Sequence, residues 1–246
     1  MSKFKFVVVS KDKDIKISNA VSKAMFDING HEVDVSEITN NKLSLATVYN
    51  MKLNEERQFI SHDFLVFMHA DVTFDVKQFL NHVEQCKCKY DVMGLCGTST
   101  MNVSQSPLNW WTGSNPTPTS KWGCVTHGEL GDKKSFFNSH SPDITDHEAA
   151  CIDGLCIVFG PKAIESGMTF DEQFTYDFYD TDISFQTVLK HKLKLGVIVE
   201  QSLQHYSVGK SILTKDFLSH EIDFRKKWSL EIPPNSPIRQ MLSQSS

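Results

Sequence analysis

A histidine and an aspartate directly follow one of the most apolar runs in the sequence. The run spans residues 64–68 and ends at His69-Ala70-Asp71. An aspartate at the end of a buried strand is held rigidly, and hard divalent cations prefer carboxylate oxygens as ligands. Asp71 can therefore bind a cation that bridges a diphosphate. The alternative is that Asp71 caps the helix that follows, and the spacing favours neither role over the other.

Five acidic residues lie within twelve positions, just before an amphipathic segment; they are Asp171, Glu172, Asp177, Asp180 and Asp182. Carboxylates at a helix N-terminus interact favourably with the helix dipole, so capping is one explanation for them. A carboxylate held at the rim of a site can instead act as a general base toward a hydroxyl. Asp180 and Asp182 need not both be caps, and both are candidates for that base.

His205 is the third candidate for chemistry, because it follows the last predicted strand and can complete a metal site with Asp71. A role in packing or at the surface is the alternative. The nearby Gly209-Lys210-Ser211 is similar to the end of a phosphate-binding loop. The upstream glycine of that loop is missing, which excludes it.

Alternating strand and helix patterns must position these groups. Runs rich in β-formers predict strands over residues 4–9, 32–38, 64–68 and 91–96. Helical spacing predicts helices over residues 14–26, 43–56 and 75–86, the second with Ser44 as its cap. This order is typical of an α/β domain with a mostly parallel sheet. Ligands bind at the carboxyl ends of such strands, where Ser10, Asn40 and His69 to Asp71 gather.

The middle of the chain has a different composition. Between residues 98 and 149 small polar residues, glycine and proline surround Trp110, Trp111 and Trp122. Long irregular stretches in compact domains are often functional. Farther along we expect a strand over residues 155–159, a helix over 181–192, a strand over 195–199 and a loose tail after Pro233.

Composition indicates a globular protein without a membrane span. The chain has 246 residues, 40% of them hydrophobic and 22% charged, with a mean hydropathy of −0.28. No apolar run approaches the ~20 residues of a transmembrane helix, and no signal peptide is evident. The net charge of −5 argues against a nucleic-acid-binding protein. The six cysteines are interpreted as reduced, small buried residues of a cytoplasmic protein rather than a zinc site; they are Cys86, Cys88, Cys96, Cys124, Cys151 and Cys156.

The order of the motifs resembles the family-2 glycosyltransferases of the GT-A fold. The order is a strand ending in x-x-Asp, Asp153-Gly154, Phe170-Asp171-Glu172, Asp180-Thr181-Asp182 and His205. Residues 44–50 are similar to the family's second-helix signature. His-x-Asp in place of Asp-x-Asp, together with the paired tryptophans, is similar to a bacterial subgroup likened to a streptomycin-biosynthesis glycosyltransferase. The resemblance covers roughly residues 4–211.

The resemblance implies one GT-A domain over residues 1–215 and an extension over residues 216–246. Residues 1–97 would bind the nucleotide-diphosphate sugar, with Ser10, Asn40, Asn50, His69 and Asp71 around it. Residues 98–215 would bind a glycan, lipid-linked or small-molecule acceptor. Asp153, Gly154, Trp110 and Trp111 would line the sugar and acceptor pocket, although core packing is the alternative for each tryptophan.

The resemblance also implies an inverting, metal-assisted transfer. Asp180 matches the usual base, Tyr179 stands where the family has another acid, and Asp182 is the second choice. Asp71 and His205 would hold Mn²⁺ or Mg²⁺. The protein would be cytoplasmic, free or peripheral at the membrane. The alternatives are a nucleotide-sugar-forming nucleotidyltransferase, disfavoured because residues 10–14 lack glycine, and a non-catalytic binding module of the same fold.

Overall fold

The computed structural model describes residues 2–12, 30–108, 120–128, 133–137, 144–207 and 214–244, the segment 133–137 in its backbone only. The helix expected over residues 14–26, the pair Trp110 and Trp111, and Gly209-Lys210-Ser211 lie outside these ranges.

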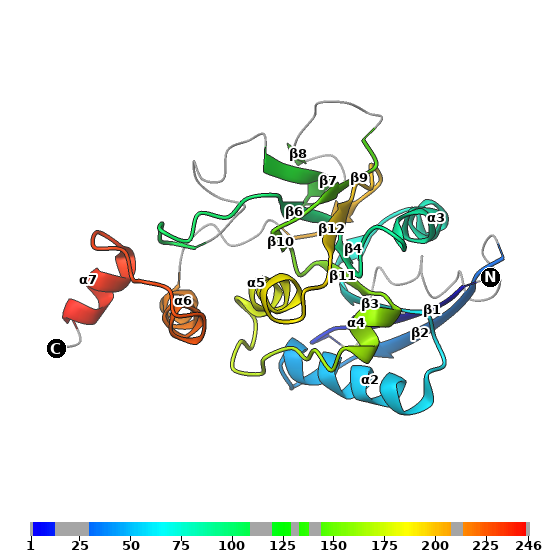
Figure 1. Cartoon of the computed structure of the whole chain (residues 1–246), viewed down its shortest axis with the longest axis horizontal. Helices are drawn as coiled ribbons and strands as arrows, with labels where there is room; N and C mark the ends of the chain where they lie inside the picture. The colour runs from blue at the N-terminus through cyan, green and yellow to red at the C-terminus, as the bar shows by residue number, and fades with distance from the viewer. Residues whose placement is uncertain are drawn as a thin grey trace.

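A seven-stranded sheet forms the centre of the domain (Figure 1). Its spatial order is β2 (Glu32–Ile38), β1 (Lys3–Val9), β3 (Phe64–His69), β11 (Cys156–Phe159), β5 (Val92–Gly94), β12 (Leu195–Ile198) and β9 (Asp146–Glu148). β1 is parallel to β2 and β3, and β12 is parallel to β5. β11 is antiparallel to both of its neighbours and β9 is antiparallel at the edge, so the sheet is mixed.

A second sheet of mostly short strands lies beside the first. Its order is β10 (Cys151–Ile152), β6 (Cys96–Thr98), β7 (Lys121–His127), β13 (Gln204–His205) and β4 (Val72–Thr73), with β8 (Lys133–Phe137) paired to β7. The single strand expected over residues 91–96 is therefore two strands in two sheets. The bend between them requires glycine, because a Cβ on Gly94 would lie 2.7 Å from the Cβ of Ile152.

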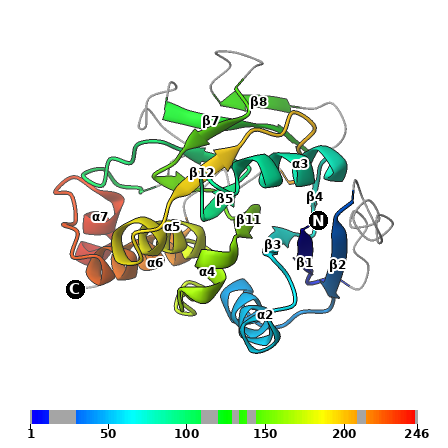
Figure 2. The ribbon, with the colours of Figure 1, turned by 45° about the vertical axis from the view of Figure 1, so that its right-hand side comes forward.

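Helices cover both faces of the central sheet (Figures 1 and 2). α2 (Leu45–Phe59) packs with Val7, Leu65 and Phe67 on one face. α3 (Val76–Cys86) packs with Phe6 and Val66 on the other. This division follows from the two-residue alternation of strand side chains. None of the described helices has the length and apolarity needed to cross a bilayer.

The helix caps decide one question that the sequence left open. The Thr47 N–H donates to the Ser44 Oγ at 3.1 Å, which confirms the predicted cap of α2. The Gln78 N–H donates to the Asp75 Oδ1 at 3.1 Å, so Asp75 caps α3. The capping role considered for Asp71 is therefore wrong.

The described part of the C-terminal half carries four more helices and the π-helical turn η2. They are α4 (Pro161–Glu165), α5 (Tyr179–Phe185), η2 (Gln186–Lys190), α6 (Lys215–Lys227) and α7 (Pro237–Gln244). The tail expected to be loose after Pro233 contains α7, where Ile238 is fully buried. Of the six cysteines, five are buried, Cys88 is exposed and all are free thiols.

The extension packs tightly against the rest of the domain. Phe224 of α6 lies 5.3 Å from Phe178 and 5.0 Å from Phe185, measured between ring centroids. Arg225, only 1% exposed, donates to the backbone carbonyls of Val103 and Gln105. α6 is therefore part of the same hydrophobic core as α5.

Candidate active site

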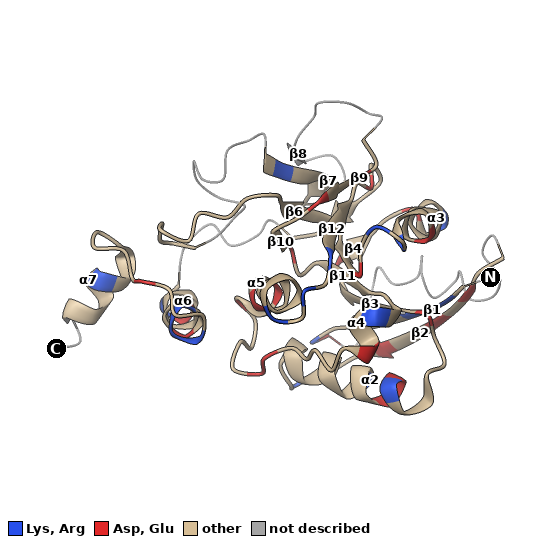
Figure 3. Ribbon diagram, viewed as in Figure 1, with Lys and Arg blue, Asp and Glu red and all other residues tan. Residues whose placement is uncertain are grey.

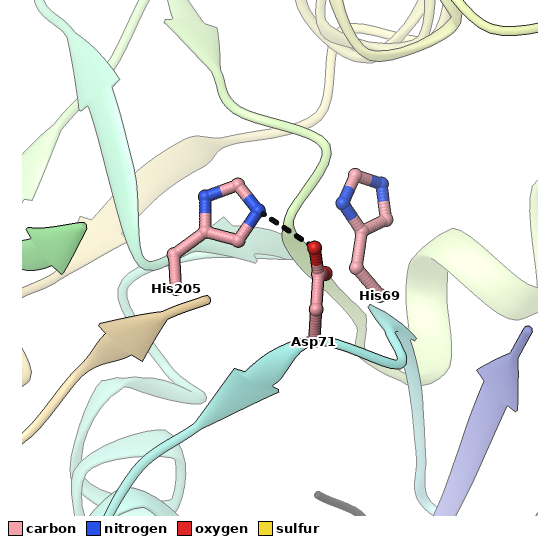
Figure 4. Close-up of side chains that lie close together, drawn as sticks. All are labelled: His69, Asp71 and His205. Atoms are coloured by element: carbon pink, nitrogen blue, oxygen red, sulfur yellow. Dashed lines mark ion pairs between the residues drawn. The ribbon is translucent and has the colours of Figure 1, made fainter. Parts of the chain in front are cut away.

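Three side chains that can bind a metal meet at the carboxyl end of β3 (Figure 4). His69 ends β3, Asp71 follows in the turn to β4, and His205 ends β13. One ligand atom from each lies within 4.8 Å of the other two. The Tyr206 N–H donates to the Asp71 carbonyl at 2.8 Å, so the pairing of β4 with β13 fixes this approach.

The donor set fits a divalent cation. The Nε2 of His205 is 3.5 Å from the Oδ2 of Asp71, which is longer than an ordinary hydrogen bond. Two adjacent ligands bound to one ion at 2.0–2.2 Å are about 2.8–3.1 Å apart in octahedral geometry and about 3.3–3.6 Å apart in tetrahedral geometry. The Asp71 side chain is 43% exposed, which leaves the site open on one side.

The charges within this cluster favour the ligating form of the carboxylate. Burial alone would raise the pKa of Asp71, but His205 and His69 lower it below its usual value. Burial would lower the pKa of His205, but its contact with Asp71 raises it. Burial lowers the pKa of His69, which keeps that imidazole neutral near pH 7.

Tyr179 connects His69 to the Asp153-Gly154 turn. Its hydroxyl is 2.7 Å from the Nε2 of His69 and donates to the Gly154 carbonyl at 2.9 Å. A Cβ on Gly154 would lie 2.0 Å from this hydroxyl, so the contact requires glycine. Because Tyr179 is only 2% exposed, water does not compete for these bonds.

Asp180 lies on the other side of the same turn. Its Oδ2 accepts the Gly154 N–H at 3.0 Å, and its Oδ1 accepts the Thr181 N–H at 2.7 Å. Burial and the charge of Asp153 raise the pKa of Asp180 to about 7. A carboxylate with such a pKa is suited to general base catalysis near neutral pH.

The comparison with families decides the class of the protein. A family model described as "Glycosyltransferase like family" matches residues 5–224. The chain belongs to this family. No curated protein sequence matches the chain significantly.

Solved glycosyltransferase structures share the fold of this family member. GalNAc-T7 with UDP, GalNAc and Mn²⁺ gives a TM-score of 0.55 at 9% identity, over 92% of this chain and 48% of that one. S. aureus TarS gives 0.50 at 12% identity, over 89% of this chain and 38% of that one. The glycosyltransferase-like chain thus spans less than half of either structure. These likenesses confirm the predicted GT-A α/β fold as a single domain.

Asp182 of this glycosyltransferase-like chain contacts the C-terminal extension. It is fully buried, and its carboxylate accepts the Trp228 Nε1–H at 2.9 Å and the Gln186 amide at 2.7 Å. It also forms an ion pair with Lys227 at 2.8 Å. Figure 3 shows acidic residues on α5 and basic residues on the neighbouring α6. These contacts occupy both oxygens of Asp182.

The residues predicted to bind the nucleotide lie in two different places in the fold. Ser10 follows β1 and Asn40 follows β2, and the Asn41 N–H donates to the Ser10 carbonyl at 3.0 Å, so the two strand ends adjoin. Asn50 lies within α2, where its amide bonds the Phe170 carbonyl at 2.8 Å and accepts the Phe170 N–H at 2.9 Å. The structure thus gives Asn50 a contact between α2 and the segment before α5.

Asp153 lies among the groups of the candidate site. Its charge acts on His69, His205 and Asp180, and its Oδ1 accepts the Leu155 N–H at 2.8 Å. The structure therefore brings together His69, Asp71, Asp153, Gly154, Asp180 and His205.

Sequence reasoning missed the structural role of Tyr179 and the proximity of two further side chains. His127 lies 5.5 Å from His205 between ring centroids, and the half-exposed Tyr176 lies close enough to be influenced by Asp71 and Asp180. From the order of the motifs, Tyr179 is recognisable only as a residue that stands where the family has an acidic residue. No signal along the chain relates His127 to His205, because the parallel pairing of β7 with β13 joins them.

Proposed function

We propose that the protein transfers a sugar from a nucleoside-diphosphate donor to an acceptor hydroxyl, with Asp180 as general base. The observation that carries this is the placement of Asp180. Its raised pKa and its hydrogen bond to Gly154 put a base of suitable strength next to the turn that contacts the Asp71 cluster.

The chemistry assigned to the residues is a single displacement. Asp180 accepts the proton of the acceptor hydroxyl while the oxygen of that hydroxyl bonds to the anomeric carbon. At the same time the bond from the anomeric carbon to the diphosphate oxygen breaks. Such a step inverts the anomeric centre. General base catalysis contributes about 10²–10⁴-fold, and positioning and electrostatics supply the rest.

Asp71 and His205 are the residues proposed to hold Mn²⁺ or Mg²⁺, with His69 beside them. When bound, the cation would stabilise the negative charge of the leaving diphosphate. Ser10, Asn40 and Asn50 are proposed to lie around the nucleotide. Asp153 and Gly154 are proposed to line the sugar and acceptor pocket, together with Trp110 and Trp111. Membership of the streptomycin-type subgroup stays a prediction.

Thermal stabilisation by donors tests this proposal. UDP-, GDP- and dTDP-sugars are screened with and without Mn²⁺, against the wild-type chain and Asp71→Ala. A ligand at about 100 times its dissociation constant adds about 2.7 kcal/mol of stability. We expect one nucleotide class to raise the Tm in the presence of Mn²⁺, and Asp71→Ala to lose that increase relative to its own unliganded Tm.

Transfer itself is measured as release of nucleoside diphosphate from the donor that binds. If the donor binds but no nucleoside diphosphate is released, with any acceptor or with water alone, the non-catalytic module would be supported instead. Nucleoside triphosphate consumption with sugar phosphate would support the nucleotidyltransferase. No binding by any nucleotide sugar would refute the proposal.

A further inference from the structure

His69 is held in one tautomer by its hydrogen-bond partners. The Tyr179 hydroxyl has a single proton, and it donates this proton to the Gly154 carbonyl at 2.9 Å, since a carbonyl can only accept. The same hydroxyl is 2.7 Å from the Nε2 of His69. The Nε2 must therefore carry a proton and donate it to Tyr179. In neutral His69 the lone pair then resides on Nδ1.

The free lone pair faces the other two members of the cluster. Figure 4 shows the second ring nitrogen of His69 on the side of Asp71 and His205. The ring centroids of the two histidines are 6.2 Å apart. An imidazole nitrogen held in this way, with its opposite nitrogen donating to a fixed acceptor, is the usual arrangement of a metal-ligating histidine.

The surroundings keep the arrangement rigid. Tyr179 begins α5, is almost fully buried and packs beside Tyr49 at 6.3 Å between ring centroids. Any side chain at Gly154 would displace the hydroxyl, because its Cβ would lie 2.0 Å away. The Gly154 N–H is bonded to Asp180, which holds the acceptor carbonyl in place from the other side.

We propose that His69 is a third metal ligand through Nδ1, that Tyr179 is the positioning residue that holds it, and that the site therefore selects a divalent transition-metal ion over Mg²⁺. This deepens the proposed metal-assisted function and rests on it for its purpose. The chemical reason is the donor set. Imidazole nitrogens suit transition metals, whereas Mg²⁺ prefers oxygen ligands and strict octahedral geometry. Two imidazoles and one carboxylate thus favour a divalent transition-metal ion over Mg²⁺, and among these ions Co²⁺ binds more tightly than Mn²⁺.

The test measures metal binding without donor or acceptor. Co²⁺ binding is followed by its visible absorption and Mn²⁺ binding by electron paramagnetic resonance, in the wild-type chain, Tyr179→Phe and Tyr49→Phe. Tyr49 is the matched control, because it is a buried tyrosine of the same core whose hydroxyl has no hydrogen-bond partner among the residues that the structure describes. Circular dichroism and Tm establish that each variant is folded.

We expect Tyr179→Phe to weaken metal binding about 10–100-fold, the usual effect of losing the partner of a metal-bound histidine. Tyr49→Phe is expected to bind as the wild type does. Mg²⁺ is expected to displace Co²⁺ only at concentrations at least about tenfold higher than Mn²⁺ needs. Equal affinities in Tyr179→Phe and the wild type, or equal displacement by Mg²⁺ and Mn²⁺, would overturn the proposal.

A wild-type measurement keeps the proposal testable if Tyr179→Phe does not fold. Electron spin-echo modulation of bound Mn²⁺ detects coordinated imidazole nitrogens, and comparison with His69→Gln separates two imidazole ligands from one. An identical nitrogen signal in both proteins would exclude His69 as a ligand. Because no sugar donor is involved, metal binding that depends on Tyr179 in a protein without transfer activity would refute only the proposed function.

Discussion

Asp180 and Asp182 lie two residues apart on α5, but their surroundings differ, so matched amide substitutions separate a catalytic carboxylate from a structural one. The Asp180 carboxylate bonds to the backbone N–H groups of Gly154 and Thr181 and to the Thr181 hydroxyl, beside the Asp71 cluster. Asp182 holds the extension through Lys227 and Trp228. Asp180→Asn and Asp182→Asn each replace one oxygen with nitrogen and change neither shape nor helix propensity greatly.

For Asp182→Asn we expect a loss of stability and little loss of chemistry. Removing one partner of a buried ion pair costs about 3–5 kcal/mol. The Lys227 side chain is 28% exposed and keeps its ion pair with Asp171 at 2.7 Å, which reduces this to about 2–3 kcal/mol. The NH₂ group of the new asparagine is a donor and would face the donor of Gln186 or Trp228, so the lost hydrogen bond adds about 1 kcal/mol to the cost. The free energy of unfolding should therefore fall by about 3–4 kcal/mol, with the turnover of the folded protein within about threefold of wild type.

For Asp180→Asn we expect the opposite result. Loss of the base should lower turnover about 10²–10⁴-fold. The stability should change by less than about 2 kcal/mol, because two effects oppose each other. A neutral amide avoids the cost of burying a charge, but it has one acceptor oxygen where Asp180 uses two for Thr181 and Gly154.

Urea unfolding and nucleoside-diphosphate release, measured on the same preparations, check both expectations. Donor affinity is measured separately, since Asp180→Asn should retain it. A variant Asp182→Asn that is as stable as the wild type but inactive, beside an active Asp180→Asn, would refute the assignment of the two carboxylates.

Three further outcomes follow from the same structure. The rate of transfer should rise with pH through about 7 and level off above it, because ionised Asp180 is the base; a rate that does not change between pH 5.5 and pH 8.5 would contradict this. Burial, with the charge of Asp75, raises the pKa of Glu200 to about 8, so the folded state holds a proton that the unfolded state releases. The stabilisation contributed by protonated Glu200 is therefore fully present below about pH 4.5 and is lost as the pH rises through about 8, by about 1.4 kcal/mol per unit of pKa difference at most, and Glu200→Gln should remove this part of the pH dependence in urea titrations. Gly154→Ala should lower the Tm and weaken Mn²⁺ binding together, because its Cβ would displace the Tyr179 hydroxyl; unchanged metal affinity in a folded variant would contradict the coupling.

Local sequence patterns predicted several of the described elements in the first half of the chain. The predicted strand at 32–38 has the observed bounds of β2, and Ser44 caps α2 as expected. These features depend on the spacing of apolar residues and on one capping side chain, both of which are local. The strand-end argument also brought His69 and Asp71 to the correct edge of the sheet.

The rest depends on contacts between distant segments. β4 and β13 contain two residues each, too few for any periodicity, yet their pairing joins Asp71 to His205. The bond between Tyr179 and His69 spans 110 positions. Asp182 finds its partners Lys227 and Trp228 more than 40 positions along the chain. Such contacts are set by packing, and a single sequence contains no direct signal for them.

The dependence of α5 on α6 has a consequence during synthesis. A ribosome releases the chain from its N-terminus, at about 5–20 residues per second, so β1, β2 and β3 can pair while the C-terminal part is still being made. Asp182 has no counter-charge, and Phe178 and Phe185 lack part of their apolar cover, until Phe224, Lys227 and Trp228 have emerged. The helix that carries Asp180 is thus completed late, and a nascent chain stalled before residue 228 would hold the paired strands β1, β2 and β3 next to an exposed, aggregation-prone α5.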